Sequence, residues 1–278
     1  MAKPDFLVIG AQKAGTTWLD KMFKSHPNIW TPVVKELQFF NTYYMPEAFK
    51  WNKAHRESHA LKAISYAINE ENRNKIDWNK IKQATLIGEK DNVDYSWYQS
   101  VFDYAPVEAI KGEMTPEYSL LNEEHVKDVV GHYPEIKIIL VMRDPLQRAL
   151  SGIKMRLLQQ GYTNETNQEE VDNFVISCAS DWDVIERGNY ERIMNTWLKF
   201  IDKKQFLPLL SESLKKDGKQ QLAKVSRFLA LPESEFIANA NVLVHVGKSY
   251  NISQHAIDEV ATHQEKNTIW FSEYIKNV

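Results

Sequence analysis

Cysteine is almost absent from this sequence, which has only Cys178 in its 278 residues. A disulfide within the chain is therefore excluded, and the composition fits a reducing compartment. Long apolar runs are also missing, because no stretch reaches the roughly 18 residues that a membrane-spanning helix needs. The first expected strand begins at Asp5, which leaves no room for a signal peptide. We therefore expect a cytoplasmic protein with no membrane partner.

A strong charge of either sign is missing too, since 34 Lys and Arg residues nearly balance 37 Asp and Glu residues. No nucleic-acid partner is expected from this balance. The sequence also has no repeat, no low-complexity tract and no Pro/Gly linker. With 278 residues, 43% of them hydrophobic, the chain is long enough for one substantial core. We predict a single domain over residues 1–278.

Apolar strand-like runs alternate with amphipathic stretches along the chain. Strands are expected at residues 5–10, 136–142 and 205–210, with a possible short strand at 84–88. Helices are expected at residues 15–25, 122–132, 145–159, 168–177, 189–202, 218–230 and 254–263. Strands separated by helices predict an α/β fold with a central parallel sheet covered on both faces. Pro208 lies inside one strand, which favours an edge position or a bulge there.

The segment FLVIGAQKAGTTWLDKMF, residues 6–23, has the layout of a phosphate-binding loop. A buried strand leads into a turn bracketed by Gly10 and Gly15, and a helix then begins whose free N–H groups suit an anion. The glycine spacing matches a Walker A loop, but Thr16 takes the place of the Walker lysine and Lys13 lies inside the turn. A lysine there suits a leaving group that develops charge without a metal. The alternative is an ordinary strand-to-helix turn with a solvated lysine.

This loop resembles the 5′-phosphosulfate loop of sulfotransferases that use 3′-phosphoadenosine 5′-phosphosulfate (PAPS), which contains a [KR]xGTT[WS]L-like segment. The resemblance implies a P-loop-like strand, loop and helix that hold the donor. It assigns donor binding to Lys13, Ala14, Gly15, Thr16, Thr17 and Trp18.

Two further segments extend the resemblance in the right order. VMRDPLQRALSG, residues 141–152, is similar to the family's 3′-phosphate segment, which implies that Arg143 and Ser151 bind that phosphate. A guanidinium suits this role because it presents a planar fork of donors and stays charged. VVKELQFFNT, residues 33–42, is similar to the KEVHFFD or EEVQFFN segment of heparan-sulfate-type enzymes, which implies that Glu36 is the general base. Taken alone, VMRDPLQRALSG also fits an Arg143–Asp144 pair at the end of a strand. VVKELQFFNT, taken alone, also fits a solvated strand start.

Three weaker segments complete the resemblance, which covers about the first 45 residues and residues 95–278. KGEMTPEYSLL, residues 111–121, is similar to GEKTPAYL, but Met114 replaces the family's lysine. Residues 185–232 follow a family pattern of core positions, in which we interpret Tyr190 and Trp197 as packing residues first. VGKSYN, residues 246–251, is similar to a loop that closes over PAPS, which implies roles for Lys248 in catalysis and for Lys248 and Ser249 in donor binding.

Residues 46–94 match no family segment. We predict a helical insertion that lines or covers the acceptor site. His55 and His59 are one helical turn apart, and we interpret them as solvated residues rather than a metal pair, because no third ligand follows. They are also the backup candidates for the base, and no metal site is expected.

The charge distribution bears on the acceptor. Residues 89–128 contain three lysines and ten acids: Glu89, Asp91, Asp94, Asp103, Glu108, Glu113, Glu117, Glu123, Glu124 and Asp128. A polyanionic glycan would be repelled by such a surface, whereas a neutral or cationic small molecule would not. The alternative is that most of these acids form a solvated face.

The residues and the resemblance together predict a PAPS-dependent sulfotransferase that acts by in-line transfer to a small-molecule hydroxyl or amine. Glu36 would take the acceptor proton, Lys13 and Lys248 would stabilise the leaving 5′-phosphate, and adenosine 3′,5′-bisphosphate would be the product. One alternative is a metal-dependent kinase, for which Asp144 is the candidate magnesium ligand. Another is a non-catalytic module that binds a phosphoadenosine nucleotide.

Overall fold

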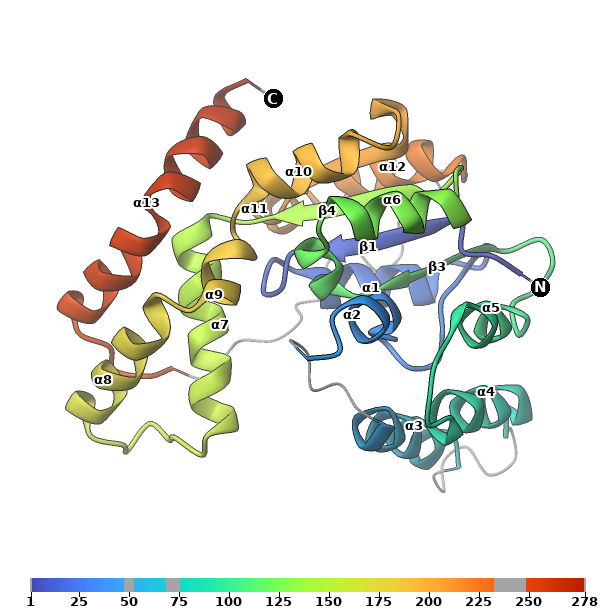
Figure 1. The fold of residues 1–278 in the computed structure, drawn as a ribbon, viewed down its shortest axis with the longest axis horizontal. Helices are drawn as coiled ribbons and strands as arrows, with labels where there is room; N and C mark the ends of the chain where they lie inside the picture. The colour runs from blue at the N-terminus through green and yellow to red at the C-terminus, as the bar shows by residue number, and fades with distance from the viewer. Residues whose placement is uncertain (1, 48–52, 69–75, 233–248, 278) are drawn as a thin grey trace.

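The computed structural model describes residues 2–47, 53–68, 76–232 and 249–277. They form an α/β fold around a five-stranded, wholly parallel sheet with strand order β2-β3-β1-β4-β5 (Figure 1). The strands are β1 (Phe6–Gly10), β2 (Ile29–Trp30), β3 (Ile110–Met114), β4 (Lys137–Met142) and β5 (Phe206–Leu210). The predicted fold class is therefore confirmed.

The central strand β1 is buried at all five positions, as its unbroken apolar run predicts for a strand covered on both faces. The strands expected at 136–142 and 205–210 are β4 and β5. Pro208 pairs with Leu140 in β5, an edge strand of the sheet, so its expected edge position is confirmed. The sequence patterns did not indicate β2, which has two residues, or β3, which is part of the KGEMTPEYSLL segment.

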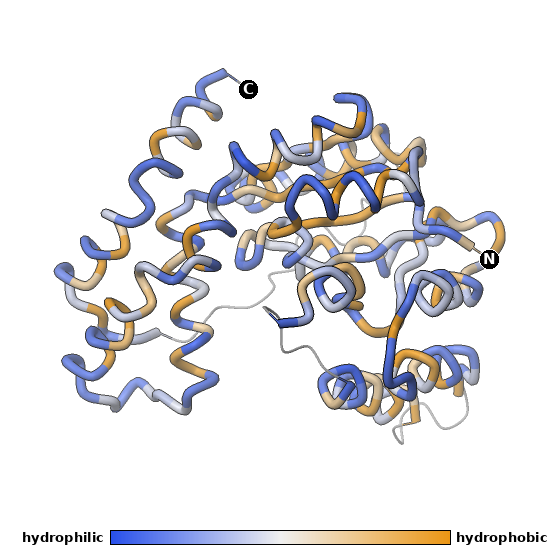
Figure 2. Tube along the Cα trace, viewed as in Figure 1, coloured by the Kyte–Doolittle hydropathy of each residue, from blue (hydrophilic) through white to orange (hydrophobic). Residues whose placement is uncertain are grey.

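Helices flank the sheet and extend beyond it on two sides (Figure 1). Those in the first half are α1 (Thr16–Ser25), α2 (Phe39–Tyr44), α3 (Lys53–Ala67), α4 (Trp78–Glu89), α5 (Tyr95–Phe102), the 3₁₀ turn η2 (Pro116–Leu120) and α6 (Glu123–His132). Those in the second half are α7 (Pro145–Gln159), α8 (Gln168–Ala179), α9 (Trp182–Glu186), α10 (Tyr190–Leu198), the 3₁₀ turn η3 (Lys203–Gln205), α11 (Ser211–Lys216), α12 (Gly218–Leu229) and α13 (Gln254–Lys276). Figure 2 shows hydrophobic and hydrophilic residues alternating along these helices, as expected where one side of each helix is buried.

The expected strand at residues 84–88 is wrong, because this segment lies inside α4. Gln83, Ala84, Ile87 and Gly88 are buried at helical spacing, and the Asp77 carboxylate caps the helix. The short apolar run ATLIG is therefore part of a helix, in which Ala84, Ile87 and Gly88 lie on the buried face.

Helix α13 continues to Lys276, beyond the expected end at residue 263. Its buried positions include the polar residues Gln264 and Asn267. Because these buried positions are not apolar, the periodic pattern of apolar residues did not indicate a helix beyond residue 263. Their amides donate to the carbonyls of Val184 (3.3 Å) and Ile185 (3.0 Å). With α7 and α8, α13 buries a second apolar cluster beside the sheet. No helix in the described part of the chain is both long and apolar enough to cross a membrane.

Candidate functional site

A cavity of about 630 Å³ lies where the loops after β1 and β4 meet α7 and α3. Strand carboxyl ends are the usual place for ligand sites in open α/β sheets, and the arrows of β1 and β4 point toward α7 (Figure 1). The residues that line it are Gln12, Lys13, Gly15, Thr16, Thr17, Trp18, Lys35, Glu36, His55, His59, Pro116, Glu117, Arg143, Ser151, Met155, Arg156, Gln159, Asp183, Arg187, Ser211 and Lys215.

The loop between β1 and α1 forms one wall of the cavity. Gly15 precedes α1 with φ of 107°, a conformation that L side chains rarely adopt. Gly10 lies so close to η2 that a Cβ atom would come within 3.1 Å of the Pro116 carbonyl oxygen. These two glycines let the loop curl tightly and turn the first N–H groups of α1 toward the cavity, which makes the loop suited to an anion.

Lys13 occupies the centre of this loop, with a left-handed φ of 70°. Burial and the neighbouring Arg143 lower the pKa of its ammonium group, while Glu36 acts in the opposite direction. The Arg143 guanidinium donates from Nη1 to the Lys13 carbonyl oxygen at 3.1 Å, so it also fixes the loop. Two cations held this close together repel each other, and a bound anion would relieve that repulsion.

Arg143 follows β4 directly, and Tyr190 holds its backbone in place. The Tyr190 hydroxyl accepts from the Arg143 N–H (3.1 Å) and donates to the Arg143 carbonyl (2.9 Å). Tyr190 is buried and outside the cavity lining, as is Trp197. Asp144 caps α7 by accepting from the Gln147 N–H at 2.8 Å. Ser151, two turns further along α7, lines the same cavity as Arg143.

Glu36 lies in the loop that precedes α2, also with a positive φ of 65°. Its carboxylate forms an ion pair with Lys35, and the two side chains remain 26% and 20% exposed. It is therefore open to the cavity and has an adjacent cation. Of the four non-glycine residues with positive φ in the described chain, three are in or next to this site: Lys13, Glu36 and Gln38.

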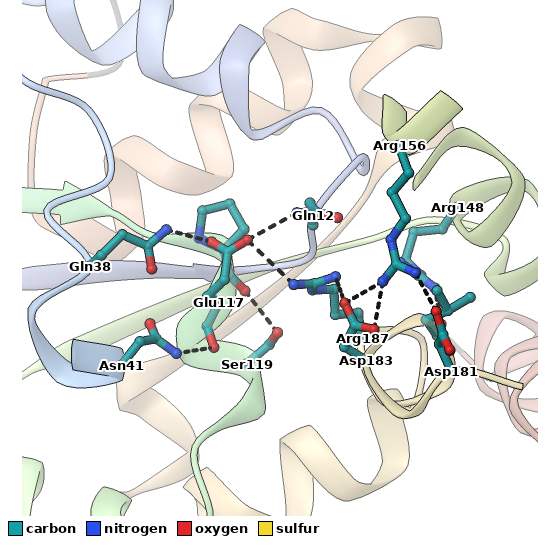
Figure 3. Close-up of polar contacts among 12 residues, drawn as sticks. Gln12, Gln38, Asn41, Glu117, Ser119, Arg148, Arg156, Asp181, Asp183 and Arg187 are labelled. Atoms are coloured by element: carbon teal, nitrogen blue, oxygen red, sulfur yellow. Dashed lines mark hydrogen bonds and ion pairs between the residues drawn. The ribbon is translucent and has the colours of Figure 1, made fainter. Parts of the chain in front are cut away.

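Glu117 is a buried carboxylate that connects the loops around the cavity (Figure 3). It accepts hydrogen bonds from Gln12 (3.0 Å) and Gln38 (2.9 Å), and Arg187 lies 3.8 Å away. Burial raises the pKa of this carboxyl, and the nearby Glu36 raises it further. Glu117 therefore ties the anion loop, through Gln12, to the Glu36 loop, through Gln38.

An ionic network continues from Glu117 to α7 (Figure 3). Arg187 pairs with Asp183, which also accepts from Arg156 Nη2 at 2.6 Å. A second nitrogen of Arg156 reaches Asp181 at 2.5 Å. The network fixes Arg156 on the α7 face that also presents Ser151.

Most of the expected site residues line this one cavity: Lys13, Gly15, Thr16, Thr17, Trp18, Glu36, Arg143 and Ser151. Two others do not, because Ala14 is buried and Ser249 is exposed outside the cavity lining. Met114, which replaces the family's lysine, is buried at the end of β3. Lys248 lies outside the described residues.

Several cavity residues were not expected from the sequence, chiefly Gln12, Lys35, Glu117 and Arg187. All four lie in segments that carry the resemblance, so their positions were the available signal. All ten acids of residues 89–128 are described; eight are exposed and Glu113 is buried outside the cavity lining. Glu117 alone among them lines the cavity, so the acid excess mostly forms a solvated face.

No group of three or more His, Cys, Asp or Glu side chains in the described segments is placed to hold a metal ion. His55 and His59 are adjacent, with ring centroids 4.4 Å apart. They line the cavity from α3, within the segment that matched no family motif.

A parallel sheet whose first strand leads into an anion-binding loop defines a P-loop-like α/β protein. The Sulfotransferase family profile matches residues 4–235, and the chain belongs to that family. Among solved structures, it is similar to a sulfotransferase from Alicyclobacillus acidocaldarius, with a TM-score of 0.63 and 21% identity over 96% of this chain and 93% of that one. It is also similar to a sulfotransferase domain from the curacin biosynthetic pathway, with a TM-score of 0.59 and 15% identity over 98% and 99% of the two chains. These two likenesses show the fold.

The chain is also similar to curated proteins that are longer than it is. The membrane-associated sulfotransferase kil1 of Dictyostelium discoideum is 23% identical over 307 residues, which cover 95% of this chain and 64% of that protein. Heparan sulfate glucosamine 3-O-sulfotransferase 6 of Mus musculus is 24% identical over 136 residues, or 49% of this chain and 40% of that protein. The chain thus spans less than two thirds of the length of each.

Proposed function

We propose that this protein transfers the sulfuryl group of PAPS to a hydroxyl or amine of a small-molecule acceptor. The observation that carries the proposal is that one cavity contains the Lys13 loop, the Arg143–Ser151 pair and the Glu36 carboxylate. The first two are suited to the two phosphate ends of a 3′,5′-bisphosphorylated nucleotide, and the third to the acceptor proton. Membership of the sulfotransferase family supports the same chemistry.

The donor would be held by residues of the two loops. The N–H groups at the start of α1, with Thr16 and Thr17, suit the 5′-phosphosulfate, and Arg143 with Ser151 suits the 3′-phosphate. By the resemblance, Lys248 and Ser249 belong to the loop that closes over the nucleotide. Bound PAPS supplies the sulfuryl group, and Lys13 stabilises the charge that grows on the 5′-phosphate as the bridging S–O bond breaks.

Glu36 is the proposed base. Its carboxylate is partly exposed to the cavity, and its position in a fixed loop allows it to accept the proton of the attacking group. The adjacent Lys35 orients the carboxylate. Met114, which replaces the family's lysine, is buried, whereas Lys35 pairs with Glu36 and Lys13 also lies close enough to interact with it.

With the donor bound, the overall charge of the cavity favours a neutral or cationic acceptor over a polyanion. Six basic side chains line it against three acidic ones: Lys13, Lys35, Arg143, Arg156, Arg187 and Lys215 against Glu36, Glu117 and Asp183. The donor's 3′-phosphate alone would bring about two negative charges, and its phosphosulfate adds more. Once the donor is bound, no positive surplus remains to attract a polyanion.

The kinase alternative depended on Asp144, which caps α7 and is outside the cavity lining.

The choice between two nucleotides tests the proposed donor directly. Adenosine 3′,5′-bisphosphate should raise the melting temperature by several degrees at saturating concentration, and ATP with magnesium should have little effect. Equal stabilisation by ATP would contradict the proposed donor. Donor binding without sulfation of any compound in a broad acceptor panel would favour the non-catalytic module.

A further inference from the structure

Helix α3 presents two histidines to the cavity. His55 and His59 are one turn apart, both are half-buried, and their rings are tilted by 36° with centroids 4.4 Å apart. They come from a part of the chain that carries none of the family's motifs, so the resemblance assigns them no binding role.

The neighbouring face of α3 holds the helix in place. Arg56 is buried and donates to the carbonyls of Lys90 (2.7 Å) and Asp91 (3.3 Å), and its guanidinium lies 5.8 Å from the centroid of the Trp97 ring. One turn further, Ala60 packs against Gly88 of α4, where a Cβ atom would come within 2.9 Å of the Ala60 Cβ. Because Arg56 and Ala60 anchor one face, the adjacent face keeps the histidines at the cavity wall.

The two histidines lie at the Glu36 end of the cavity. Lys35, which pairs with Glu36, acts electrostatically on His59 and also on Lys13. We infer from this effect that His59 lines the part of the cavity that holds Lys35 and Glu36.

Both imidazoles are uncharged at neutral pH. Burial, then the neighbouring His59 and Lys62, lowers the pKa of His55 to about 4. Burial, Lys62 and Lys35 lower the pKa of His59 as well. A neutral imidazole offers one N–H donor, one nitrogen acceptor and a flat ring, which suits an uncharged polar partner.

The charges around Glu36 disfavour other acceptors. An amine enters as an ammonium ion, and beside Glu36 it would meet Lys35, which already pairs with the Glu36 carboxylate. Glu117 offers it no free partner, because Gln12, Gln38 and Arg187 surround that carboxylate. A carboxylate or sulfate on the acceptor would be repelled by the donor.

We propose that His55 and His59 form the acceptor subsite, and that this subsite selects an uncharged compound with a hydroxyl group over amines and anions. The inference rests on the proposed function, which it narrows to O-sulfation. The hydroxyl oxygen forms the new S–O bond, the bridging S–O bond to the 5′-phosphate breaks, and the proton passes to Glu36.

Three probes of one size test the subsite: 2-phenylethanol, 2-phenylethylamine and phenylacetate. Their binding to the protein saturated with adenosine 3′,5′-bisphosphate is measured by ligand-observed NMR at pH 7.5. The alcohol should bind about tenfold more tightly than the amine or the carboxylate, as expected when an uncharged polar site rejects charged analogues. Equal or tighter binding of either charged probe, or no detectable binding of the alcohol, would overturn the proposal.

Substitutions of His55 and His59 test whether these two residues cause the preference for the alcohol. The double variant His55→Leu/His59→Leu should lose the preference for the alcohol, and His55→Gln/His59→Gln should retain part of it because glutamine is neutral and polar. His263→Leu, an exposed position on α13, is the matched control and should behave as the wild type. A preference that survives in the leucine variant would refute the role of the histidines.

Melting temperatures with adenosine 3′,5′-bisphosphate serve as a separate readout. If the nucleotide fails to stabilise the wild-type protein, the proposed donor is wrong whatever the acceptor result.

Discussion

At the scale of single residues, the cavity is built on backbone that other residues must hold in place. Lys13, Glu36 and Gln38 all have positive φ, which costs a non-glycine residue on the order of 1 kcal/mol or more. The compensating contacts are specific, since Arg143 binds the Lys13 carbonyl and Glu117 binds the Gln38 amide. Residues that never touch a ligand can therefore control the geometry of those that do.

Replacing Glu36 by Gln keeps the size of the side chain and removes its basicity. We expect turnover to fall by roughly 10² to 10⁴ while the affinity for adenosine 3′,5′-bisphosphate stays nearly unchanged. Steady-state kinetics and nucleotide titration measure the two effects. Glu124→Gln, an exposed acid on α6, is the control. If Glu36→Gln turns over like the wild type, the base is another residue, and His55 and His59 are the next to test.

Glu117 is expected to act through its hydrogen bonds rather than as a base. Glu117→Leu leaves Gln12, Gln38 and the buried Arg187 without this partner, and we expect a loss of unfolding free energy of about 1–3 kcal/mol or more. Glu117→Gln should lose less, because its amide oxygen can still accept a hydrogen bond. Urea titration compares the two variants, and a leucine variant as stable as the wild type would contradict this role.

At the scale of elements, the packing of α3 on α4 sets the wall of the proposed acceptor subsite. Gly88→Ala would place a Cβ atom 2.9 Å from the Ala60 Cβ, so α3 must shift. We expect a loss of about 1–3 kcal/mol in stability and weaker acceptor binding, with nucleotide binding retained.

Gly131→Ala on α6 is the matched control, because a Cβ atom there meets nothing within 4 Å. It should stabilise the protein by up to about 1 kcal/mol through helix propensity. Chemical denaturation and acceptor titration distinguish the two variants. If Gly88→Ala matches Gly131→Ala in both measurements, the position of α3 does not depend on this contact.

The sequence predicted the elements whose pattern is local and periodic. The apolar runs of β1, β4 and β5 and the amphipathic periods of α1, α6 and α7 place these elements within a few residues of their observed bounds. The two-residue β2 has too little pattern to detect, and polar Gln264 and Asn267 conceal the second half of α13. Local propensity could not separate the ATLIG run of α4 from a strand.

The site was predictable only where a segment carries its own chemistry. Lys13, Glu36, Arg143 and Ser151 come from three separate segments, and the resemblance identified each. The roles of Gln12 and Arg187 depend on the three-dimensional position of Glu117, which no local pattern contains. Placing His55 and His59 at the cavity needed the packing of α3 on α4.

At the scale of the whole molecule, buried titratable groups make stability depend on pH in opposite directions. Because the pKa of His55 falls from 6.5 to about 4 on folding, the unfolded chain binds a proton there more readily than the native state. This group's contribution to stability is present above pH 6.5 and is lost as the pH falls toward 4. Burial raises the pKa of Glu113 and Glu117, so their contribution changes the other way.

The contribution of His55 to the pH dependence of stability can be measured by comparing the wild type with a variant that lacks this histidine. Unfolding free energies of the wild type and His55→Gln should be compared by urea titration at pH 7.5, 6.0 and 5.0. We expect the wild type to lose more stability than the variant over this range, because only the wild type takes up a proton at residue 55 on unfolding. Parallel pH profiles would show that His55 is not shielded in the native state.

The proline opposite Leu140 has a consequence for solubility. Strand β5 is an edge strand of the sheet that the described residues form, with the strongly apolar sequence FLPLL, and an edge strand can recruit a strand from another molecule. Proline has no backbone N–H and is tolerated in edge strands, so β5 has one donor fewer to offer to an incoming chain. Pro208→Val would restore that donor and raise β-propensity at once. The purified variant should therefore form intermolecular β-sheet aggregates at lower concentration than the wild type, which light scattering and amyloid-dye binding would record.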